Sequence, residues 1–590
     1  MGLMSSFYIG TSGLAVSQRA LNTVSHNIAN VETEGYVRQQ VLGKSSFTRE
    51  IGQNEKNNFI VGYGAETEAI RHVRDIFLDK SYRKEYGRQE FYNVQYKAVS
   101  EIEDIFGETE GVAFRNSMND LWVSIQELCK EPDNIVCRSS LAQTAVSFIE
   151  RATMIQNQIN DYQISLNTKV QTTVDRINEI AERIDKLNND VKLYEANGLE
   201  HANDIRDERD MLLDELSGLI NISYKEDMQG IVTVSAEGYP LITGDNYFKI
   251  NTRTIDGSGG MITPYWERYD ADVFDFTYLP TTINQQDVGM LKGLLLSRGN
   301  KIGNYTDIPV APKEKDFADS ADYQLALSTF EQQKEVYTHD IESSAVVNLQ
   351  AQFDQLIHGI VTTVNDLLAP NKAVTAVDAQ GNESTVYILD RERANLGSDP
   401  KKTPGEALFN RKSVSRYEQK SITYKDENGN TVTSVEYVYT KEDKDDHYSL
   451  FTLGEIEVNP AILKDTSLLP FQKNDGTGEY DLSLAAEIMT AWQDAFATLS
   501  PNQLTYNNFN GYYTAMIGDI GTKGEQFKTI AKAQESLTTT INNERMSVTA
   551  VSTDEELTQL IKYQHAYNAS ARYINVVSEM LESLINGLLR

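Results

Sequence analysis

The side chains that most often carry chemistry are sparse in this sequence, and they lack catalytic spacing. The seven histidines are scattered, at positions 26, 72, 201, 339, 358, 447 and 565. No two of them have the His-x-x-x-His spacing that places two zinc ligands on one face of a helix. Asp426, Asn428 and Asn430 have the spacing of a calcium-binding loop, but Tyr437 stands where such a loop needs glutamate, so a hairpin turn is expected.

Motifs for nucleotide, acyl or redox chemistry are also missing from the sequence. It contains no P-loop, no Gly-x-Ser-x-Gly elbow, no dinucleotide fingerprint and no Cys-x-x-Cys pair. Cys129 and Cys137 flank a short loop and could pair across it, although two idle thiols are the simpler expectation. We therefore predict no catalytic residue, no metal site and no cofactor, and a protein that is not an enzyme.

The charge of the chain is concentrated in its middle. The formal net charge is −32 over 590 residues, whereas residues 1–50 carry four basic and three acidic side chains and residues 545–590 carry four and five. Near-neutral ends can pack closely, while an acidic body keeps copies soluble and disfavours nucleic acid as a partner. The N-terminus has no secretory-signal pattern, and no apolar run is long enough to span a membrane.

Both ends of the sequence have the hydrophobic period of coiled-coil helices. Near the C-terminus, positions spaced alternately by three and four residues form a helical stripe in which only two of ten side chains are polar. These positions are Leu557, Leu560, Gln564, Tyr567, Ala571, Ile574, Ser578, Leu581, Ile585 and Leu588. Thr553, followed by three acids, is expected to be the N-cap of this helix. A first helix, expected over residues 12–30, has similar steps at Leu14, Leu21, Val24 and Ile28. These seams need partners, either each other within one chain or other copies.

The middle of the sequence predicts an elongated helical domain with inserted β structure. Helices are expected over residues 75–105, 111–129, 135–197, 205–219, 322–368, 481–499 and 514–544. The third of these lacks glycine and proline, and roughly sixty residues at 1.5 Å each would make a rod about 90 Å long. Strands are expected over residues 230–234, 239–243, 384–389, 421–424, 431–439 and 448–453.

The fold class is therefore mainly α with inserted β, and we expect three structural parts. Residues 1–55 and 545–590 form long terminal coiled-coil helices. Residues 56–370 and 456–544 form an elongated helical bundle, built by both halves of the chain, with a small β portion. Residues 371–455 form an inserted, β-rich outer domain. After the first helix, Asn30 is expected to take the left-handed cap and Gly35 a positive φ, before an extended segment over residues 43–64.

Residues 25–39, which read Ser-His-Asn-Ile-Ala-Asn-Val-Glu-Thr-Glu-Gly-Tyr-Val-Arg-Gln, resemble the N-terminal signature of bacterial flagellar axial proteins. The signature positions are Asn27, Ala29, Asn30, Thr33, Gly35, Tyr36 and the following Arg38. Further stretches at residues 207–210, 289–295, 518–521 and 551–571 are similar to the hook-associated protein 1 family, which forms the first hook–filament junction. The resemblance covers both ends and several interior points, but not residues 300–340 or 371–455.

The resemblance implies a structural protein of the flagellum, located outside the cell and exported by the type III apparatus without a cleaved signal. It implies a ring of copies between hook and filament, with the hook protein and the second junction protein as partners and an export chaperone on the C-terminal helix. The seam residues Leu14, Leu21, Val24, Ile28, Leu557, Leu560, Tyr567, Ile574, Leu581, Ile585 and Leu588 would then be the assembly interface. The signature turn would anchor the chain as it leaves the first helix; it comprises Asn27, Ala29, Asn30, Thr33, Gly35, Tyr36 and Arg38.

Two alternatives remain open. The first is a different flagellar axial protein, such as the hook protein or the second junction protein, although the length and residues 289–295 favour the first junction family. The second is an extracellular binding protein or adhesin that uses residues 371–455 to capture its ligand.

Overall fold

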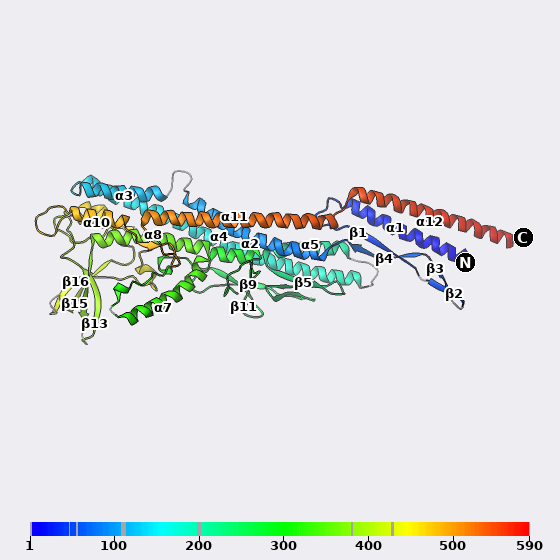
Figure 1. The fold of residues 1–590 in the computed structure, drawn as a ribbon, viewed down its shortest axis with the longest axis horizontal. Coiled ribbons are helices and arrows are strands. Elements are labelled where there is room, and N and C mark those ends of the chain that lie inside the picture. The colour runs from blue at the N-terminus through cyan, green and yellow to red at the C-terminus, as the bar shows by residue number, and fades with distance from the viewer. Residues whose placement is uncertain are drawn as a thin grey trace.

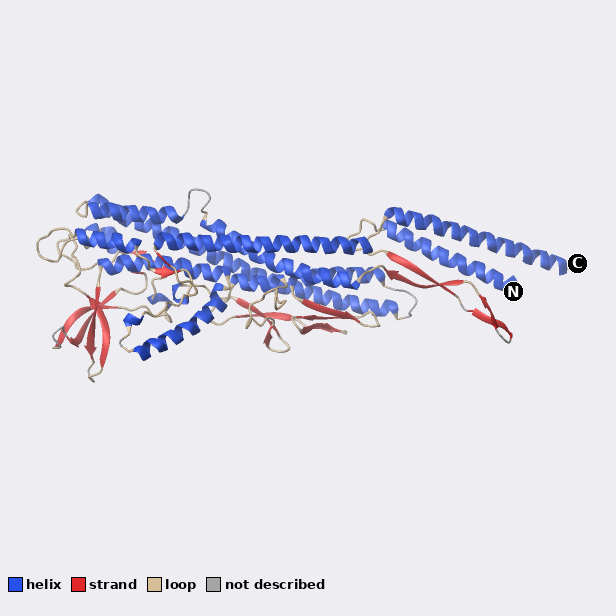
Figure 2. Cartoon of the chain, viewed as in Figure 1, coloured by secondary structure: helices blue, strands red, loops and turns tan. Residues whose placement is uncertain are grey.

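The computed structural model of the chain is a long rod in which helices run along most of the length (Figure 1). It describes residues 3–46, 48–54, 57–107, 114–196, 202–244, 246–317, 319–378, 381–425 and 430–588. Both termini lie at one end of the rod, and a small group of strands projects from its side near the other end (Figure 2). This arrangement confirms the mainly α fold class with inserted β. Among the described residues, no helix is long and apolar enough to cross a membrane.

The end with both termini is formed by α1 (Leu3–Ala29) and α12 (Thr553–Leu588), which lie side by side. The helix α12 has the predicted bounds, but its cap is Ser552 rather than Thr553, because the Ser552 hydroxyl accepts a hydrogen bond from the Glu555 amide at 3.5 Å. The prediction for the first helix was too short, since Gly10 and Gly13 interrupt the apolar pattern before Leu14.

A β ribbon follows α1 and runs beside it. The strands β1 (Gln39–Ser45) and β4 (Ala65–His72) pair antiparallel, and the hairpin of β2 (Thr48–Asn54) and β3 (Asn57–Gly62) continues beyond them. Most of the described part of the extended segment predicted over residues 43–64 is thus paired strand, and residues 47, 55 and 56 lie outside the described residues. At Gly64 φ is +106° and an added Cβ would lie 2.0 Å from the Ser12 hydroxyl, so glycine permits the ribbon to contact α1 there.

The body of the rod is a bundle of helices. These are α2 (Ile76–Phe106), α3 (Phe114–Lys130), α4 (Ile135–Glu195), α5 (Asn203–Leu219), α6 (Met290–Arg298), α8 (Ala345–Leu368), α10 (Leu482–Gln493) and α11 (Phe509–Thr549). With 61 residues, α4 is the predicted rod of about 90 Å. Asp75 and Asn134 cap α2 and α4 with side-chain oxygens that accept backbone amides.

Residues far apart in the sequence complete one core. Phe106 meets Phe353 edge-on with ring centroids 5.4 Å apart, and the Phe114 and Tyr513 rings are 5.5 Å apart. All four rings are almost fully buried, and burial of large aromatic surface is a dominant favourable contribution to folding. The prediction that both halves of the chain build the bundle is therefore confirmed, and α11 lies along α2 for much of its length.

Two small antiparallel sheets cover part of α4. One contains β5 (Ile222–Glu226), β6 (Val232–Ala236), β7 (Tyr239–Thr243) and β8 (Asn246–Tyr247), and the other contains β9 (Ile250–Thr254), β10 (Ile262–Trp266) and β11 (Ala271–Asp272). Glu237 and Gly238 form the β6–β7 turn, and both have positive φ. The side chains of Asn178 and Asn188 on α4 donate to Ile250 and Val232 carbonyls at 2.8 and 2.9 Å.

The single helix predicted over residues 322–368 is wrong. Instead, α7 (Ser320–Val336) passes into a π-helical turn over Tyr337–Glu342, and α8 begins after it. The Ser344 hydroxyl accepts a hydrogen bond from the Val347 amide at 3.4 Å and caps the new helix, a signal that the hydrophobic period does not carry. The helix predicted over residues 481–499 also ends early, at Gln493, before β18 (Ala497–Thr498) pairs with β19 (Tyr506–Asn507).

The inserted strands form a closed barrel. Its strands β12 (Asn371–Val377), β13 (Glu383–Leu389), β16 (Thr431–Tyr439) and β15 (Tyr417–Lys425) neighbour each other in that order. The strand predicted over residues 448–453 is wrong, because Phe451 and Leu453 both turn into the main core while Glu442 and Asp354 accept their amides at 2.8 and 2.7 Å. Nearby, β14 (Phe409–Arg411) pairs with β17 (Ile456–Val458), and α9 (Pro460–Lys464) follows.

Candidate assembly site

The predicted seams of α1 and α12 face each other within the chain. On α1, Val24 is buried and the other seam residues are half-buried, namely Leu14, Leu21 and Ile28. On α12 the half-buried seam residues are Leu560, Tyr567, Ile574 and Leu581, whereas Leu557 and Ile585 are exposed. The Leu588 side chain lies outside the described residues. In a single copy, these seams therefore serve the intrachain pair, and their role between copies stays a prediction.

Small residues bring the two helices close together. A Cβ added to Gly10 would lie 2.6 Å from the Ile574 side chain, and one added to Gly13 would lie 3.0 Å from the Ser570 hydroxyl. Beside this contact, Gly10, Gly13, Gly64 and Tyr573 line part of an open hollow of about 450 Å³. The terminal pair thus presents a recess to its surroundings.

A second apolar stripe lies on the flank of α12, beside the face that contacts α1. It consists of large side chains that are between 42% and 54% exposed, namely Ile561, Tyr573, Val576, Met580 and Leu584. The last four recur at steps of three and four residues, so they share one helical face. Sequence reasoning followed the single seam with the best period and missed this stripe, although the same spacing rule reveals it. Contiguous exposed apolar surface of this kind marks an interaction site.

Asn27 connects the terminal pair to the turn that follows α1. Its side-chain amide nitrogen donates to the Gln39 carbonyl at 2.9 Å and to the Glu556 carboxylate at 3.0 Å. Its side-chain oxygen accepts from the Tyr36 hydroxyl at 2.8 Å and from the Gln39 amide at 3.1 Å. Asn27 is completely buried, and all of its side-chain hydrogen-bonding capacity is used. An aspartate or leucine could not make this set of bonds.

Arg38 joins the same connection to the start of α12. Its Nε donates to Glu556 at 2.8 Å, and its guanidinium contacts Glu555 at 3.0 Å. Glu556 is only 2% exposed, so its charge depends on Arg38 and Asn27 for compensation. The acids that the sequence suggested as favourable first-turn residues of α12 therefore also bind the signature turn.

The turn itself differs in one respect from the prediction. Gly35 has φ +77°, as expected, and a Cβ there would lie 2.0 Å from the Met211 sulfur. Asn30 keeps a negative φ, so its predicted left-handed cap is wrong; instead its side chain donates to the His26 carbonyl at 3.0 Å and accepts from Thr33 at 3.2 Å. Ala29 is the exposed last residue of α1. Helical turns that close locally in this way need no left-handed residue.

The motif at residues 207–210 lies at the junction between the turn and the body. Asp207 accepts a hydrogen bond from the Val37 amide at 3.1 Å, which links α5 to the signature turn. The buried Arg209 donates to the Gly230 carbonyl at 2.6 Å and to Asn188 at 3.1 Å, which links α5 to the first sheet and α4. The family resemblance at these residues thus corresponds to a structural joint.

Asp210 belongs to a cluster of buried charges that joins α2, α5 and α11. Arg83 donates to Asp210 at 3.1 Å and to Asp214 at 2.6 Å, and it is 3% exposed. Arg74 contacts Asp79 and Asp210, while Arg545 of α11 contacts Asp214 at 2.7 Å. These pairs hold the pKa of Asp210 below its usual range against the opposing effect of burial. The cluster fixes the base of the body, next to the signature turn.

Asp207 makes the junction sensitive to pH. Burial raises its pKa from 3.8 to about 7, because the ionised form loses its water. His72 Nδ1 lies 3.6 Å from Asp207, beyond hydrogen-bonding distance, so this contact does not cancel the effect of burial. Burial, followed by the charges of Asp204, Asp207 and Glu556, also raises the pKa of Tyr36. Protonated Asp207 is therefore the form that the folded junction favours.

We expect the wild-type junction to gain stability on acidification relative to the Asp207→Asn variant. Because the folded pKa is raised, the contribution of Asp207 to stability is complete near pH 4 and is lost as the pH rises through about 7. Hydrogen exchange of peptides covering residues 30–45 at pH 8 and pH 5.5, each corrected for intrinsic exchange, measures this contribution. Asparagine still accepts the Val37 amide but does not titrate. Parallel pH profiles for the two proteins would contradict the assignment.

Outside the terminal pair and the junction, the described residues contain few side chains placed for metal binding or catalysis. In this part of the chain, no three histidine, cysteine, aspartate or glutamate side chains are placed to hold a metal ion. Cys129 and Cys137 are free thiols, and burial raises the pKa of Cys129 to about 11, which makes it unreactive. Asp426 and Asn428 of the expected hairpin turn lie outside the described residues.

Comparison with known proteins places the chain among flagellar components. Residues 99–382 match the family described as "Flagellar hook-associated protein FlgK helical domain". Residues 7–36 match "Flagella basal body rod protein", and residues 543–587 match "Flagellar basal body rod FlgEFG protein C-terminal". The two terminal matches fall on α1 and α12, which the structure brings together.

The similarity to individual proteins extends over the whole chain. Flagellar hook-associated protein 1 of Bacillus subtilis (strain 168) is 25% identical over 593 residues, which covers 99% of both chains. The protein of the same name from Escherichia coli (strain K12) is 22% identical and covers 98% of both. A solved structure, the flagellar hook junction protein from Burkholderia pseudomallei, aligns with a TM-score of 0.47 at 14% identity, over 79% of this chain and 100% of that one.

Proposed function

The chain belongs to the flagellar hook-associated protein 1 family, and we propose that it joins hook to filament as a ring of self-assembled copies. It is a structural component of the bacterial flagellum. The observation that carries the ring is the second apolar stripe of α12, whose side chains stay about half exposed in the single chain. A helix pair with one face satisfied within the chain and another exposed can pack against the same pair in neighbouring copies.

The proposal also assigns a separate structural role in the ring to each part of the chain. The paired α1 and α12 form the axial core, the helical bundle forms the body of the ring, and the barrel of residues 371–439 faces outward. Support comes from the core of the body, whose buried residues run from Val99 to Ile520 and include none from α1 or α12. The terminal pair can therefore exchange neighbours without disturbing the body.

Partners follow from the position in the flagellum. The copies contact each other, the hook protein lies on one side and the second junction protein on the other. An export chaperone holds α12 before assembly, using a stripe that is later covered by neighbouring copies. The protein is located outside the cell after export through the type III apparatus.

Labelling intact flagella tests the proposal directly. Antibodies to the barrel, coupled to gold, are expected to mark a single band at the boundary between hook and filament in electron micrographs. Cells that lack the protein, examined in the same way, provide the control. Label along the filament, on the cell surface or in the medium alone would contradict the proposed function.

A further inference from the structure

One face of α2 carries positive charge in a strongly acidic chain. Phe77, Lys80 and Lys84 share this face, since residues three, four and seven apart on a helix lie on the same side. Phe77 is 75% exposed, and both lysines are exposed. Neither lysine forms an ion pair within the described part of the chain; Lys84 donates to the Gln285 side chain at 2.9 Å. Both lysine side chains are therefore open to a carboxylate of another molecule.

The surface around these lysines is concave. Lys80 and Lys84, together with Tyr224 and Val288, line part of a hollow of about 400 Å³. The nearby Arg83 also reaches its wall, but Arg83 is already paired with Asp210 and Asp214. The hollow therefore offers two available charges and a mixed polar and apolar lining to a segment that protrudes from another molecule.

The signature turn is such a segment. Residues 31–35 are all exposed, and they include Val31, Glu32 and Glu34. Neither glutamate has an ion-pair partner among the described residues. The turn therefore presents two unpaired carboxylates and one apolar side chain, which match the two lysines and Phe77 in number and kind.

The two surfaces lie at the same level of the rod. The Val73 amide donates to the Arg38 carbonyl at 2.9 Å, so the end of the turn lies beside the segment that starts α2. Lys80 and Lys84 occupy the second and third turns of that helix. In a ring of copies around a common axis, surfaces at the same height along the rods of two neighbouring copies lie next to each other. The turn of one copy can therefore reach the lysines of the next.

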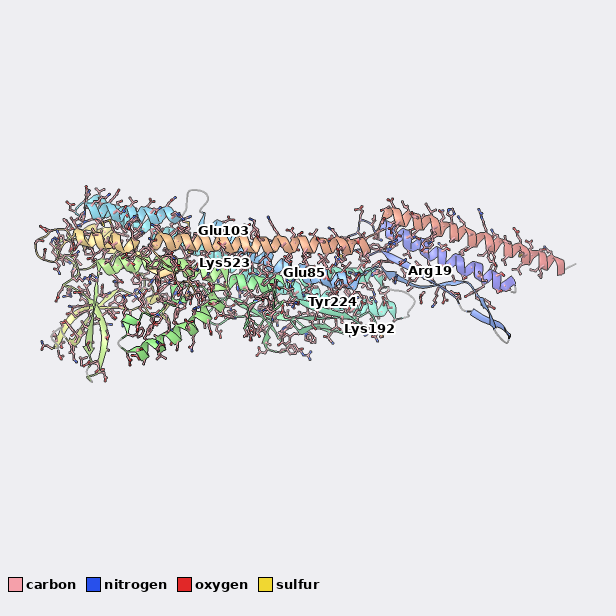
Figure 3. The ribbon with its side chains drawn as sticks, in the orientation of Figure 1. Arg19, Glu85, Glu103, Lys192, Tyr224 and Lys523 are labelled. Atoms are coloured by element: carbon pink, nitrogen blue, oxygen red, sulfur yellow. The ribbon has the colours of Figure 1, made fainter. Side chains whose placement is uncertain are left out.

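The two surfaces also lie on opposite flanks. Tyr82 and Glu85 of α2 face α11, where Arg545 lies 4.1 Å over the Tyr82 ring and Gln534 donates to Glu85 at 2.9 Å. Lys84 is two residues from Tyr82, about 200° around the helix, so it points away from α11. The turn lies between α5 and α11, because Gly35 faces Met211 of α5 and the Arg38 amide donates to the Thr549 carbonyl of α11 at 2.9 Å. Figure 3 shows Glu85 nearer to α11 and Tyr224 farther from it.

We propose that Glu32 and Glu34 of one copy dock at Lys80 and Lys84 of the next copy around the ring. Val31 then contacts Phe77, and the same contact repeats from copy to copy as a head-to-tail interface. This inference rests on the proposed function, since it concerns how the copies meet. Complementary charges on opposite flanks fix the register and reject a reversed neighbour, while the apolar α12 stripe supplies most of the buried area.

Charge reversal tests the contact in cells whose only copy carries the variant. Lys80→Glu with Lys84→Glu is expected to lower the number of hooks that bear a filament by about tenfold, as is Glu32→Lys with Glu34→Lys, because like charges then meet. Combining all four changes is expected to restore filaments to within about twofold of wild type. A matched control reverses two other exposed lysines, Lys169 and Lys464. Thermal unfolding of each purified variant confirms that the body remains folded.

Zero-length cross-linking of assembled flagella provides a second readout. Carbodiimide joins a carboxylate to an amine only in direct contact, so a dimer band containing Glu32 or Glu34 linked to Lys80 or Lys84 is expected. Normal filament numbers in the Lys80→Glu, Lys84→Glu variant, or no recovery in the fourfold variant, would overturn the contact while leaving the junction role intact. A wild-type protein absent from the hook–filament boundary would overturn both.

Discussion

Deleting residues 553–590 is expected to leave a folded body that no longer supports a filament. The main core runs from Val99 to Ile520 and needs nothing from α12, so the principal unfolding transition should be unchanged. The α1 helix, in contrast, loses its partner, and Ala20 and Val24 become exposed to water. An isolated helix with one apolar face does not offset the entropy of ordering its backbone. Circular dichroism of the purified protein and electron microscopy of hooks measure the two effects.

Hydrogen exchange separates local from global consequences of this deletion. Amides of residues 3–29 are expected to lose their protection, while those of α4 keep theirs. A shorter deletion, of residues 586–590, removes little of the α1 contact and serves as the control. Filaments attached to hooks built with the longer truncation would contradict the role given to the terminal pair.

Replacing Arg83 with methionine is expected to destabilise the body by about 3 kcal/mol, at the lower end of the cost of removing one partner from a buried ion pair. The side chain is 3% exposed and compensates Asp210 and Asp214 at once. Arg74 and Arg545 remain beside these carboxylates, which limits the loss. Urea unfolding, followed by the fluorescence of the buried Trp266 and Trp492, measures the change in the free energy of unfolding.

Arg176→Met is the matched control for this prediction. Arg176 also bridges two carboxylates, Glu179 and Glu215, but its side chain is 45% exposed and those of its partners are 68% and 42% exposed. Exposed pairs of this kind contribute roughly 0–1 kcal/mol. Equal destabilisation by the two substitutions would show that the buried cluster contributes no more to the free energy of unfolding than an exposed pair does.

Local signals in the sequence predicted much of the fold. The absence of glycine and proline from residue 135 to residue 197 indicated α4 as one helix, and the strand patterns at residues 230–234 and 239–243 indicated β6 and β7. The period of three and four residues also located α12 with its observed bounds. In each case the decisive interaction lies within a few residues of the signal, so no knowledge of distant neighbours was needed.

Interactions between distant residues could not be predicted in the same way. Asn27 is one polar residue in an amphipathic helix, and nothing near it indicates that Glu556, 529 positions later, completes its hydrogen bonds. The segment at residues 448–453 alternates like a strand, yet Asp354 and Glu442 draw its amides into the body. The lysines on α2 have ordinary helical spacing, and only the position of the signature turn gives them a candidate partner.

The contribution of α11 to the core has a consequence for how the chain reaches its folded state. Tyr513 is fully buried, and its ring lies beside the rings of Phe106 and Phe114, which precede it by about four hundred positions. A chain that arrives one end first cannot close this interior until nearly all of it is present. We therefore expect the polypeptide to stay expanded until nearly its whole length is available to fold.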